Sequence, residues 1–416
     1  MQTIELLSPA GSLKNMRYAF AYGADAVYAG QPRYSLRVRQ NDFNKLNNLK
    51  IGIEEAHTQN KKFYVTSNIL PHNAKLATFL TDITPIIAMQ PDALIMADPG
   101  LIMLVREQWP DMPIHLSVQA NTMNAAAVRF WQQIGLKRII LSRELSLEEI
   151  SEIRQQCPDI ELEVFVHGAL CVAYSGRCLL SGYLNHRDAN QGVCTNACRW
   201  DYKLHKEVEE NSYVLEEKER PGEYMPISED EHGSYIMNSK DLRAVQHVER
   251  LLAIGMDSIK IEGRTKSHYY VARTAQVYRQ AINTALAGKP FDMSLLTELD
   301  KLSNRGYTEG FLCRHPPQEY QRYSSNNSNN YQQQFVGEVS SYDSKTSLFT
   351  VIVKNHFELG DSLELIYPQG KQHFTLEHLE DQWGNKITVA PGSGYTVYIR
   401  TPLESEVEYG LLLKKY

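Results

Sequence analysis

The sequence predicts an α/β protein with a (β/α)8 barrel followed by a small all-β domain. Over residues 1–287, short apolar runs alternate with longer amphipathic stretches of helical length. There are eight such runs, the number of strands in a closed TIM-like barrel. The runs are IELL (4–7), AVYA (26–29), FYVT (63–66), ALIM (93–96), IHLS (114–117), RIIL (138–141), LEVFV (162–166) and SIKIE (258–262). A doubly wound open sheet is the alternative, and the count of eight favours the barrel.

Stretches of helical length separate most of the predicted strands. They include residues 13–23, 74–89, 124–135 and 146–157. Gly23, Gly135 and Gly255 each stand shortly before a predicted strand. Glycine is favoured at this point because the residue after a helix often adopts a left-handed conformation. We therefore expect a helix to end at each of the three.

The chain divides into three predicted parts. Residues 1–287 form the catalytic barrel, with a cysteine-containing insertion at 167–238 after the seventh strand and a helix starting near Ser239. Within this insertion, the acidic stretch 207–231 is interpreted as a solvated hairpin. Residues 288–334 are interpreted as a linker because they include the polar stretch SSNNSNNYQQQ. Residues 335–416 show short alternating runs typical of a small β barrel or sandwich.

Composition limits the kind of protein this can be. The net charge is −6 and the isoelectric point is about 6.1, whereas a general nucleic-acid binder is expected to be basic. No apolar run reaches the roughly 18 residues that a membrane helix needs, so no membrane partner is expected. The N-terminal residues do not resemble a signal peptide. We therefore expect a cytoplasmic protein, in which thiols stay reduced.

Four of the six cysteines lie within 28 residues of the insertion, with the spacing C-x6-C-x15-C-x3-C. They are Cys171, Cys178, Cys194 and Cys198. Zinc ribbons usually contain C-x2-C pairs, and this segment has none. A [4Fe–4S] cluster takes four thiolates and tolerates uneven spacing, so it is the favoured interpretation. Structural zinc and free or redox-active thiols remain alternatives. Cys157 and Cys313, outside the segment, are interpreted as small buried residues.

Polar residues follow the predicted strands and are expected to line the C-terminal mouth of the barrel, where barrel enzymes carry their active sites. The full set is Glu5, Ser8, Arg37, Arg39, Asn68, Asp98, Gln119, Asn121, Arg143, Glu144, His167, Glu262 and Arg264. Arginines gathered at one mouth suit an anionic ligand, because guanidinium binds carboxylate and phosphate with two parallel hydrogen bonds.

From this set we predict both catalytic and ligand-binding residues. The catalytic candidates are His167, Arg143, Glu262 and Arg264, and the cofactor-binding candidates are Arg37, Asn68 and Gln119. The alternative is that Arg143–Glu144 and Glu262–Arg264 are structural ion pairs. His167, four residues before Cys171, could transfer a proton or orient the cysteine segment.

Residues 163–181, EVFVHGALCVAYSGRCLLS, closely resemble the signature of the peptidase U32 (collagenase-like protease) family. The segments ELLSPAGS (5–12), AVYAG (26–30), IKIEGR (259–264) and NRGYTEGF (304–311) are similar to the same family. The resemblance covers essentially the whole chain. In length and loop spacing the chain is most similar to the branch of the family that acts on tRNA.

The resemblance implies a reaction, a substrate and a cofactor. Members of this family are linked to oxygen-independent hydroxylation, and the tRNA branch to forming 5-hydroxyuridine at wobble uridine 34, in the anticodon loop, with prephenate required. It also implies that Cys171, Cys178, Cys194 and Cys198 ligate a [4Fe–4S] cluster. The electron donor is unknown.

Three other functions stay open at this point. They are a U32-type peptidase, a hydroxylase of an rRNA base or a quinone precursor, and a non-enzymatic scaffold in a modification complex. The sequence contains no HExxH, G-x-S-x-G, P-loop or G-x-G-x-x-G motif, which disfavours the peptidase.

Overall fold

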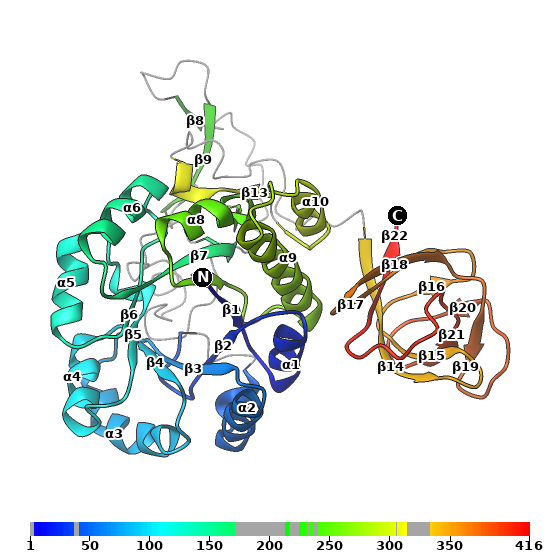
Figure 1. The fold of residues 1–416 in the computed structure, drawn as a ribbon, viewed down its shortest axis with the longest axis horizontal. Helices are drawn as coiled ribbons and strands as arrows, with labels where there is room; N and C mark the ends of the chain where they lie inside the picture. Colours follow the sequence, from blue (N-terminus) through cyan, green and yellow to red (C-terminus); the bar gives the residue numbers. More distant parts are fainter. Residues whose placement is uncertain are drawn as a thin grey trace.

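A computed structural model describes residues 4–36, 41–170, 213–216, 224–230, 233–235, 240–304, 306–313 and 333–416. It has a barrel and a separate C-terminal β domain beside it (Figure 1). The eight strands predicted for the barrel are present as β1 (Glu5–Pro9), β2 (Ala26–Gly30), β3 (Lys62–Ser67), β4 (Ala93–Met96), β5 (Ile114–Leu116), β6 (Arg138–Ile140), β7 (Glu161–Ala169) and β12 (Ser258–Ile261).

The sheet closes on itself, which confirms the barrel over the open sheet. Each strand from β1 to β7 pairs in parallel with the next, and β12 pairs in parallel with both β1 and β7. Tyr28, Tyr64, Ile95 and Phe165 belong to an apolar cluster that fills the barrel. A larger cluster packs the outside of the sheet against the helices.

The helices that cover the barrel are α1 (Leu13–Ala21), α2 (Leu46–Thr58), α3 (Asn73–Ile87), α4 (Pro99–Gln108), α5 (Ala125–Gln133), α6 (Leu147–Gln156), α8 (Val248–Ile254) and α9 (His268–Leu286). Short 3-10 helices are η1 (Asp42–Asn44), η2 (Val118–Ala120) and η5 (Val245–His247). Ser146 caps α6 with a capping box, in which the side chains of Ser146 and Glu149 each bind the other's backbone N–H. Gly23, Gly135 and Gly255 have φ values of 105°, 89° and 90°, as expected for residues that end helices.

The connection after β7 differs from the prediction. The segment expected to begin a helix near Ser239 instead forms β11 (Asp241–Arg243), which pairs antiparallel with the last residues of β7. The next helix, α8, starts at Val248. β7 leaves the barrel at its end because its register with β12 shifts between Lys260 and Ile261, and Gly168, at φ 100°, allows the bend. The predicted hairpin in the acidic insert is present as antiparallel strands β8 (Tyr213–Glu216), β9 (Tyr224–Asp230) and β10 (Gly233–Tyr235).

The predicted linker is too long. Within residues 288–334 the chain forms α10 (Ser294–Asp300), β13 (Tyr307–Thr308) and η6 (Gly310–Cys313). Leu295, Leu299 and Leu302 are buried in the outer core of the barrel, so this stretch belongs to the barrel domain. The stretch is short and is followed directly by a long polar segment, so its apolar residues give only a weak signal in the sequence.

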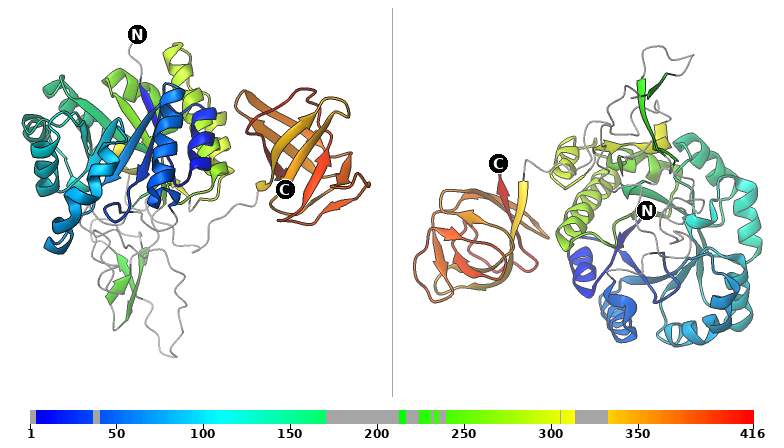
Figure 2. Two further views of the ribbon diagram at one scale, coloured as in Figure 1. Left: turned by 90° about the horizontal axis from the view of Figure 1, so that it is seen from below. Right: turned by 180° about the vertical axis from the view of Figure 1, so that it is seen from behind.

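The C-terminal domain contains β14 (Gln333–Asp343), β15 (Leu348–Val353), β16 (Phe357–Glu358), β17 (Ser362–Tyr367), β18 (Gly370–Thr375), β19 (Leu379–Asp381), β20 (Val389–Ala390), β21 (Thr396–Ile399) and β22 (Leu411–Lys415). Seven of these strands form one antiparallel sheet around a separate apolar core. Figure 2 shows the domain beside the barrel wall formed by α1 and α9, not over an end of the barrel. The described helices include none long and apolar enough to cross a membrane.

Candidate active site at the barrel mouth

Tyr28 and Glu262 meet at the C-terminal mouth of the barrel. The Tyr28 hydroxyl, from β2, lies 2.9 Å from Glu262 Oε2 and 3.0 Å from the carbonyl oxygen of Ile261. Burial raises the pKa of Tyr28 well above its ordinary value, and the neighbouring carboxylate raises it further. The phenol therefore stays protonated and can donate a hydrogen bond to Glu262.

The two described arginines of the predicted set both act electrostatically on this pair, because each lowers the pKa of Tyr28 and so partly offsets the effect of burial. The Arg143 guanidinium stacks over the ring of Phe165, with 3.8 Å between its Cζ and the ring centroid. Arg264 is buried, lies 5.8 Å from the Tyr28 ring and donates to the hydroxyls of Ser35 at 2.7 Å and Thr66 at 2.8 Å. The mouth therefore combines two guanidinium groups with a phenol and a carboxylate.

A buried lysine lies beneath the mouth. Lys260 Nζ is 4.4 Å from the centroid of the Tyr28 ring and 2.9 Å from Glu163 Oε1. Burial lowers the pKa of Lys260, although Glu163 opposes this. Tyr28 and Lys260 were not predicted as site residues, because each lies inside an apolar run rather than after it. A tyrosine and a lysine at inward positions of parallel strands are the signal that could have identified them.

Glu5 was predicted at the mouth and lies at the opposite end. It is the first residue of β1, and Arg138, the first residue of β6, binds it at 2.5 Å. Tyr64 also donates to Glu5, at 2.7 Å. Burial raises the pKa of Glu5, but Arg138 and Lys62 outweigh this and lower it. The charged layer closes the N-terminal end of the barrel and is a structural feature.

His167 does not point into the mouth. Its ring lies among three tyrosines, Tyr270, Tyr278 and Tyr307, with centroids 5.5 to 5.8 Å away. Tyr278 donates to the carbonyl oxygen of Val166, so it is suited to accept from His167 Nδ1, 3.4 Å away. Burial lowers the pKa of His167 to about 3, with a smaller effect of Arg243. Because its imidazole is neutral and enclosed, His167 is better suited to orienting the segment that follows it than to transferring a proton at the mouth.

Asn68 and Gln119 occupy the loops around the mouth. Asn68 accepts from the Leu36 N–H at 3.3 Å and donates to Ser117 Oγ at 3.1 Å, which joins the loops after β2, β3 and β5. Gln119 lies in η2, and its backbone N–H donates to the same Ser117 hydroxyl at 3.3 Å. The Asn68 amide therefore shapes the rim, whether or not it also binds a ligand.

Arg37 and the four clustered cysteines lie outside the described residues. The position where the cysteine segment begins is nevertheless defined. Leu170, the residue before Cys171, packs in the cluster that fills the barrel together with Phe165 and Leu242. The segment therefore starts at the mouth, and its four thiols are the donor set that a [4Fe–4S] cluster takes.

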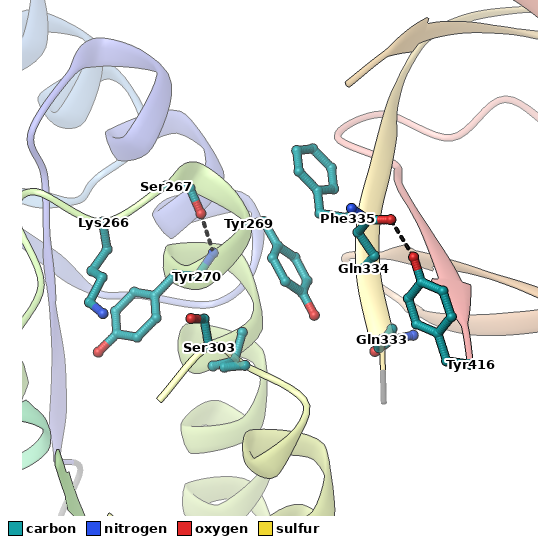
Figure 3. Close-up of a pocket in the computed structure, with 10 residues that line it drawn as sticks. Lys266, Ser267, Tyr269, Tyr270, Ser303, Gln333, Gln334, Phe335 and Tyr416 are labelled. Atoms are coloured by element: carbon teal, nitrogen blue, oxygen red, sulfur yellow. Dashed lines mark hydrogen bonds between the residues drawn. The ribbon is translucent and has the colours of Figure 1, made fainter. Parts of the chain in front are cut away.

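A hollow of about 720 Å³ lies between α9 and the C-terminal domain (Figure 3). Tyr269 stacks on Phe335 across it, with 5.4 Å between ring centroids. Tyr416 donates to Gln334 at 2.6 Å on the other side. Tyr270 lines this hollow and also donates to the carbonyl oxygen of Glu262 at 2.8 Å, so one side chain connects the domain contact with the wall of the mouth.

Comparison with known families identifies the chain. The model of peptidase family U32 matches residues 11–322, and the model of the U32 C-terminal domain matches residues 331–414. The chain belongs to peptidase family U32. The boundary between the two U32 models falls after α10, which agrees with the packing of residues 294–313 on the barrel.

Relatives within the U32 family carry names that concern RNA hydroxylation. The chain is 61% identical to tRNA hydroxylation protein P of Escherichia coli, over 99% of this chain and 97% of that protein. It is 57% identical to tRNA hydroxylation protein P of Haemophilus influenzae, over 99% and 96%. It is also 30% identical to 23S rRNA 5-hydroxycytidine C2501 synthase of E. coli, over 93% of this chain but 56% of that protein.

Proposed function

We propose that this chain is a tRNA hydroxylase that forms 5-hydroxyuridine at wobble uridine 34, with prephenate as required co-substrate. The observation that carries the proposal is the 61% identity, over nearly the full length of both proteins, to a protein named tRNA hydroxylation protein P. The rRNA synthase matches at half that identity and extends well beyond this chain, which favours tRNA over rRNA as the substrate. We expect the enzyme to act in the cytoplasm, where its substrate is found.

The chemistry of the mouth supports an anionic co-substrate. Prephenate carries two carboxylates, and the mouth supplies two guanidinium groups, that of Arg143 over Phe165 and that of Arg264 near Tyr28. The protonated phenol of Tyr28 donates a 2.9 Å hydrogen bond to the carboxylate of Glu262. In the proposed enzyme, the arginines bind the co-substrate and the Tyr28–Glu262 pair holds a proton beside it.

A tRNA substrate is compatible with the negative net charge of the chain. Recognition of one unstacked anticodon base depends more on shape and stacking than on many phosphate contacts. The base must leave its stack to enter the barrel mouth. Few phosphate contacts then predict a weak dependence of tRNA binding on salt.

We propose that Cys171, Cys178, Cys194 and Cys198 hold a [4Fe–4S] cluster at this mouth. When bound, such a cluster supplies electron transfer. The four thiols and the start of their segment at Leu170 support this assignment. Anaerobic purification should yield iron and acid-labile sulfide in equal amounts, and Cys194→Ser should reduce both. Protein that lacks iron under these conditions would contradict the cluster.

The proposed reaction can be tested in cells by deleting the gene and measuring 5-hydroxyuridine in tRNA by mass spectrometry. The nucleoside should be lost and should return with the wild-type gene. For the iron and sulfide analysis, Cys157→Ser is a matched control for Cys194→Ser and should leave both contents unchanged. Cys157 is buried between α5 and α6 and lies outside the clustered segment. Unchanged 5-hydroxyuridine after deletion, in cells with no second enzyme for it, would refute the proposal. Loss of the nucleoside in cells that cannot make prephenate would support the co-substrate.

A further inference from the structure

Three potential metal ligands meet on the outer wall of the barrel. His247 ends η5, Glu309 follows β13, and Cys313 ends η6. His247 Nε2 lies 3.0 Å from Glu309 Oε2 and 3.6 Å from Cys313 Sγ. One ligand atom from each residue lies within 4.8 Å of the others. The backbone N–H of Ala244 binds the carbonyl oxygen of Val166, so this cluster is beside the wall strand β7.

The distances match the edges of a tetrahedral zinc site. Zinc binds sulfur at about 2.3 Å and imidazole nitrogen or carboxylate oxygen at about 2.0 Å. Tetrahedral angles then place sulfur and nitrogen about 3.6 Å apart, and nitrogen and oxygen about 3.3 Å apart. The observed separations are 3.6 Å and 3.0 Å. Two of the three edges therefore already fit a tetrahedral ion, and the third, between Cys313 and Glu309, is at most 4.8 Å.

Convergence on one nitrogen distinguishes this cluster from a hydrogen-bonded relay. In a relay, the thiol and the carboxylate contact opposite nitrogens of the imidazole. Here both lie against Nε2 of His247. The Cys313 thiol is also within hydrogen-bonding reach of Glu309, so each of the three groups lies against the other two. A metal ion binds all three groups at once.

The surroundings orient the carboxylate and leave room for a further ligand. Gln246 Nε2 donates to Glu309 Oε1 at 2.7 Å, which turns the other oxygen of the carboxylate toward His247. Such hydrogen bonds to ligands commonly hold metal sites in shape. The side chains of His247 and Glu309 are 15% and 31% exposed. Solvent can therefore reach the cluster and supply a water molecule.

We propose that His247, Glu309 and Cys313 bind one zinc ion, with water in the fourth position. Thiolate, imidazole and carboxylate together favour zinc over magnesium or calcium, which take oxygen ligands alone. On binding, the Cys313 thiol releases its proton to solvent. The ion joins the end of the segment 306–313 to η5 and so anchors the chain on the barrel wall. This site uses none of the four clustered cysteines as a ligand and does not depend on the proposed function.

Element-specific measurements on the full-length chain test the proposal. Protein purified anaerobically and supplied with zinc chloride should retain about one zinc per chain after desalting, counted separately from iron by mass spectrometry. Zinc-edge X-ray absorption should report one sulfur at about 2.3 Å with the remaining ligands nitrogen or oxygen. Cys313→Ser and Glu309→Gln should each weaken zinc binding about tenfold or more. Cys157→Ser should leave the zinc content unchanged.

Several results would overturn the site. They are wild-type protein that retains no zinc, Cys313→Ser and Glu309→Gln proteins that retain it fully, or an absorption spectrum with four sulfurs, which would place the zinc on the clustered cysteines instead. Glu309→Gln preserves the shape of the side chain, so it remains informative if Cys313→Ser fails to fold. Circular dichroism establishes folding of each variant. Iron content that stays constant while zinc falls would support two separate sites.

Discussion

Tyr28 shows, at the scale of a single residue, how the barrel mouth acquires a proton donor. Its ring is packed inside the barrel and its hydroxyl reaches Glu262. Burial without a partner would cost the hydroxyl about 1–3 kcal/mol, so the hydrogen bond to Glu262 stabilises both groups in this position. Lys260 beneath the ring adds a cation–π contact at 4.4 Å.

We expect Tyr28→Phe to lower hydroxylation about 100-fold or more while the protein stays folded. The change removes the proton from the Tyr28–Glu262 pair and retains the ring, and loss of a positioned proton donor typically costs this much in rate. The measurement is the rate of 5-hydroxyuridine formation per enzyme. Tyr64→Phe is the matched control, because Tyr64 makes the same kind of hydrogen bond to Glu5 at the other end of the barrel. Equal losses in the two variants would indicate a structural effect and contradict the catalytic assignment.

At the scale of the element, the bend in β7 determines which way its side chains face. The register shift between β7 and β12 breaks the simple alternation of the strand at His167. The ring of His167 consequently lies among the tyrosines of α9 and β13, while Phe165, two residues earlier, faces the interior. Gly168 is the next residue, and the chain continues from it to Leu170 and the cysteine segment.

We expect Gly168→Ala to destabilise the barrel by about 1–3 kcal/mol and to lower the cluster content. A Cβ at this position would lie 2.4 Å from the carbonyl oxygen of Glu262, and the φ of 100° is strained for any other residue. The end of β7 must then move, and with it the start of the cysteine segment. Chemical denaturation and iron analysis measure the two effects. Gly288→Ala is a useful comparison, because Gly288 also has a positive φ, of 65°, but nothing lies within 4 Å of an added Cβ. A Gly168 variant with normal iron content would contradict the coupling.

At the scale of the whole molecule, a buried ionic contact joins the two domains. Arg273 of α9 is 1% exposed and binds Glu364 of β17 at 3.1 Å and Glu298 of α10. Tyr22 adds hydrogen bonds to the carbonyl oxygens of Ile366 and Tyr409, at 3.1 and 2.8 Å. Apolar residues of β17 and β22 belong to the same cluster as the outer core of the barrel, so the domains pack as one structure.

Arg273→Ala should destabilise the protein by about 3 kcal/mol or more, because it leaves Glu364 buried without its arginine. The free energy of unfolding in urea measures this. Arg17→Ala is the control, since Arg17 forms a surface pair with Glu55 that is 43% and 32% exposed, and removing it should cost at most about 1 kcal/mol. If Arg273→Ala lowers the free energy of unfolding no more than Arg17→Ala does, the domain contact has no stabilising role.

The same contact predicts a loss of stability in acid. Burial by itself would raise the pKa of Glu298, but Arg273, Lys371 and Lys301 outweigh it and lower the pKa to about 2. An unfolded glutamate titrates near pH 4.3. The contribution of Glu298 is therefore fully present above about pH 4.5 and is lost as the pH falls toward 2. Unfolding temperatures from pH 6 to pH 2 should fall less steeply for Glu298→Gln than for wild type, whereas Glu404→Gln, at an exposed position, should follow wild type. If the unfolding temperature falls equally with pH in all three proteins, the contribution of Glu298 is refuted.

The sequence by itself predicted the barrel, the approximate positions of its eight strands and the family. Each strand is a local apolar run, each of three helices ends at a glycine, and Arg143, Glu262 and Arg264 lie just beyond apolar runs that end at the mouth. Only the tertiary structure decided which groups meet. Arg264 binds Ser35 across 229 residues, and His247 meets Cys313 across 66. Period-two alternation cannot indicate such pairs, and one register shift was enough to turn His167 away from the mouth. Barrel closure and strand register depend on the packing of all eight strands together, so local sequence patterns cannot specify them.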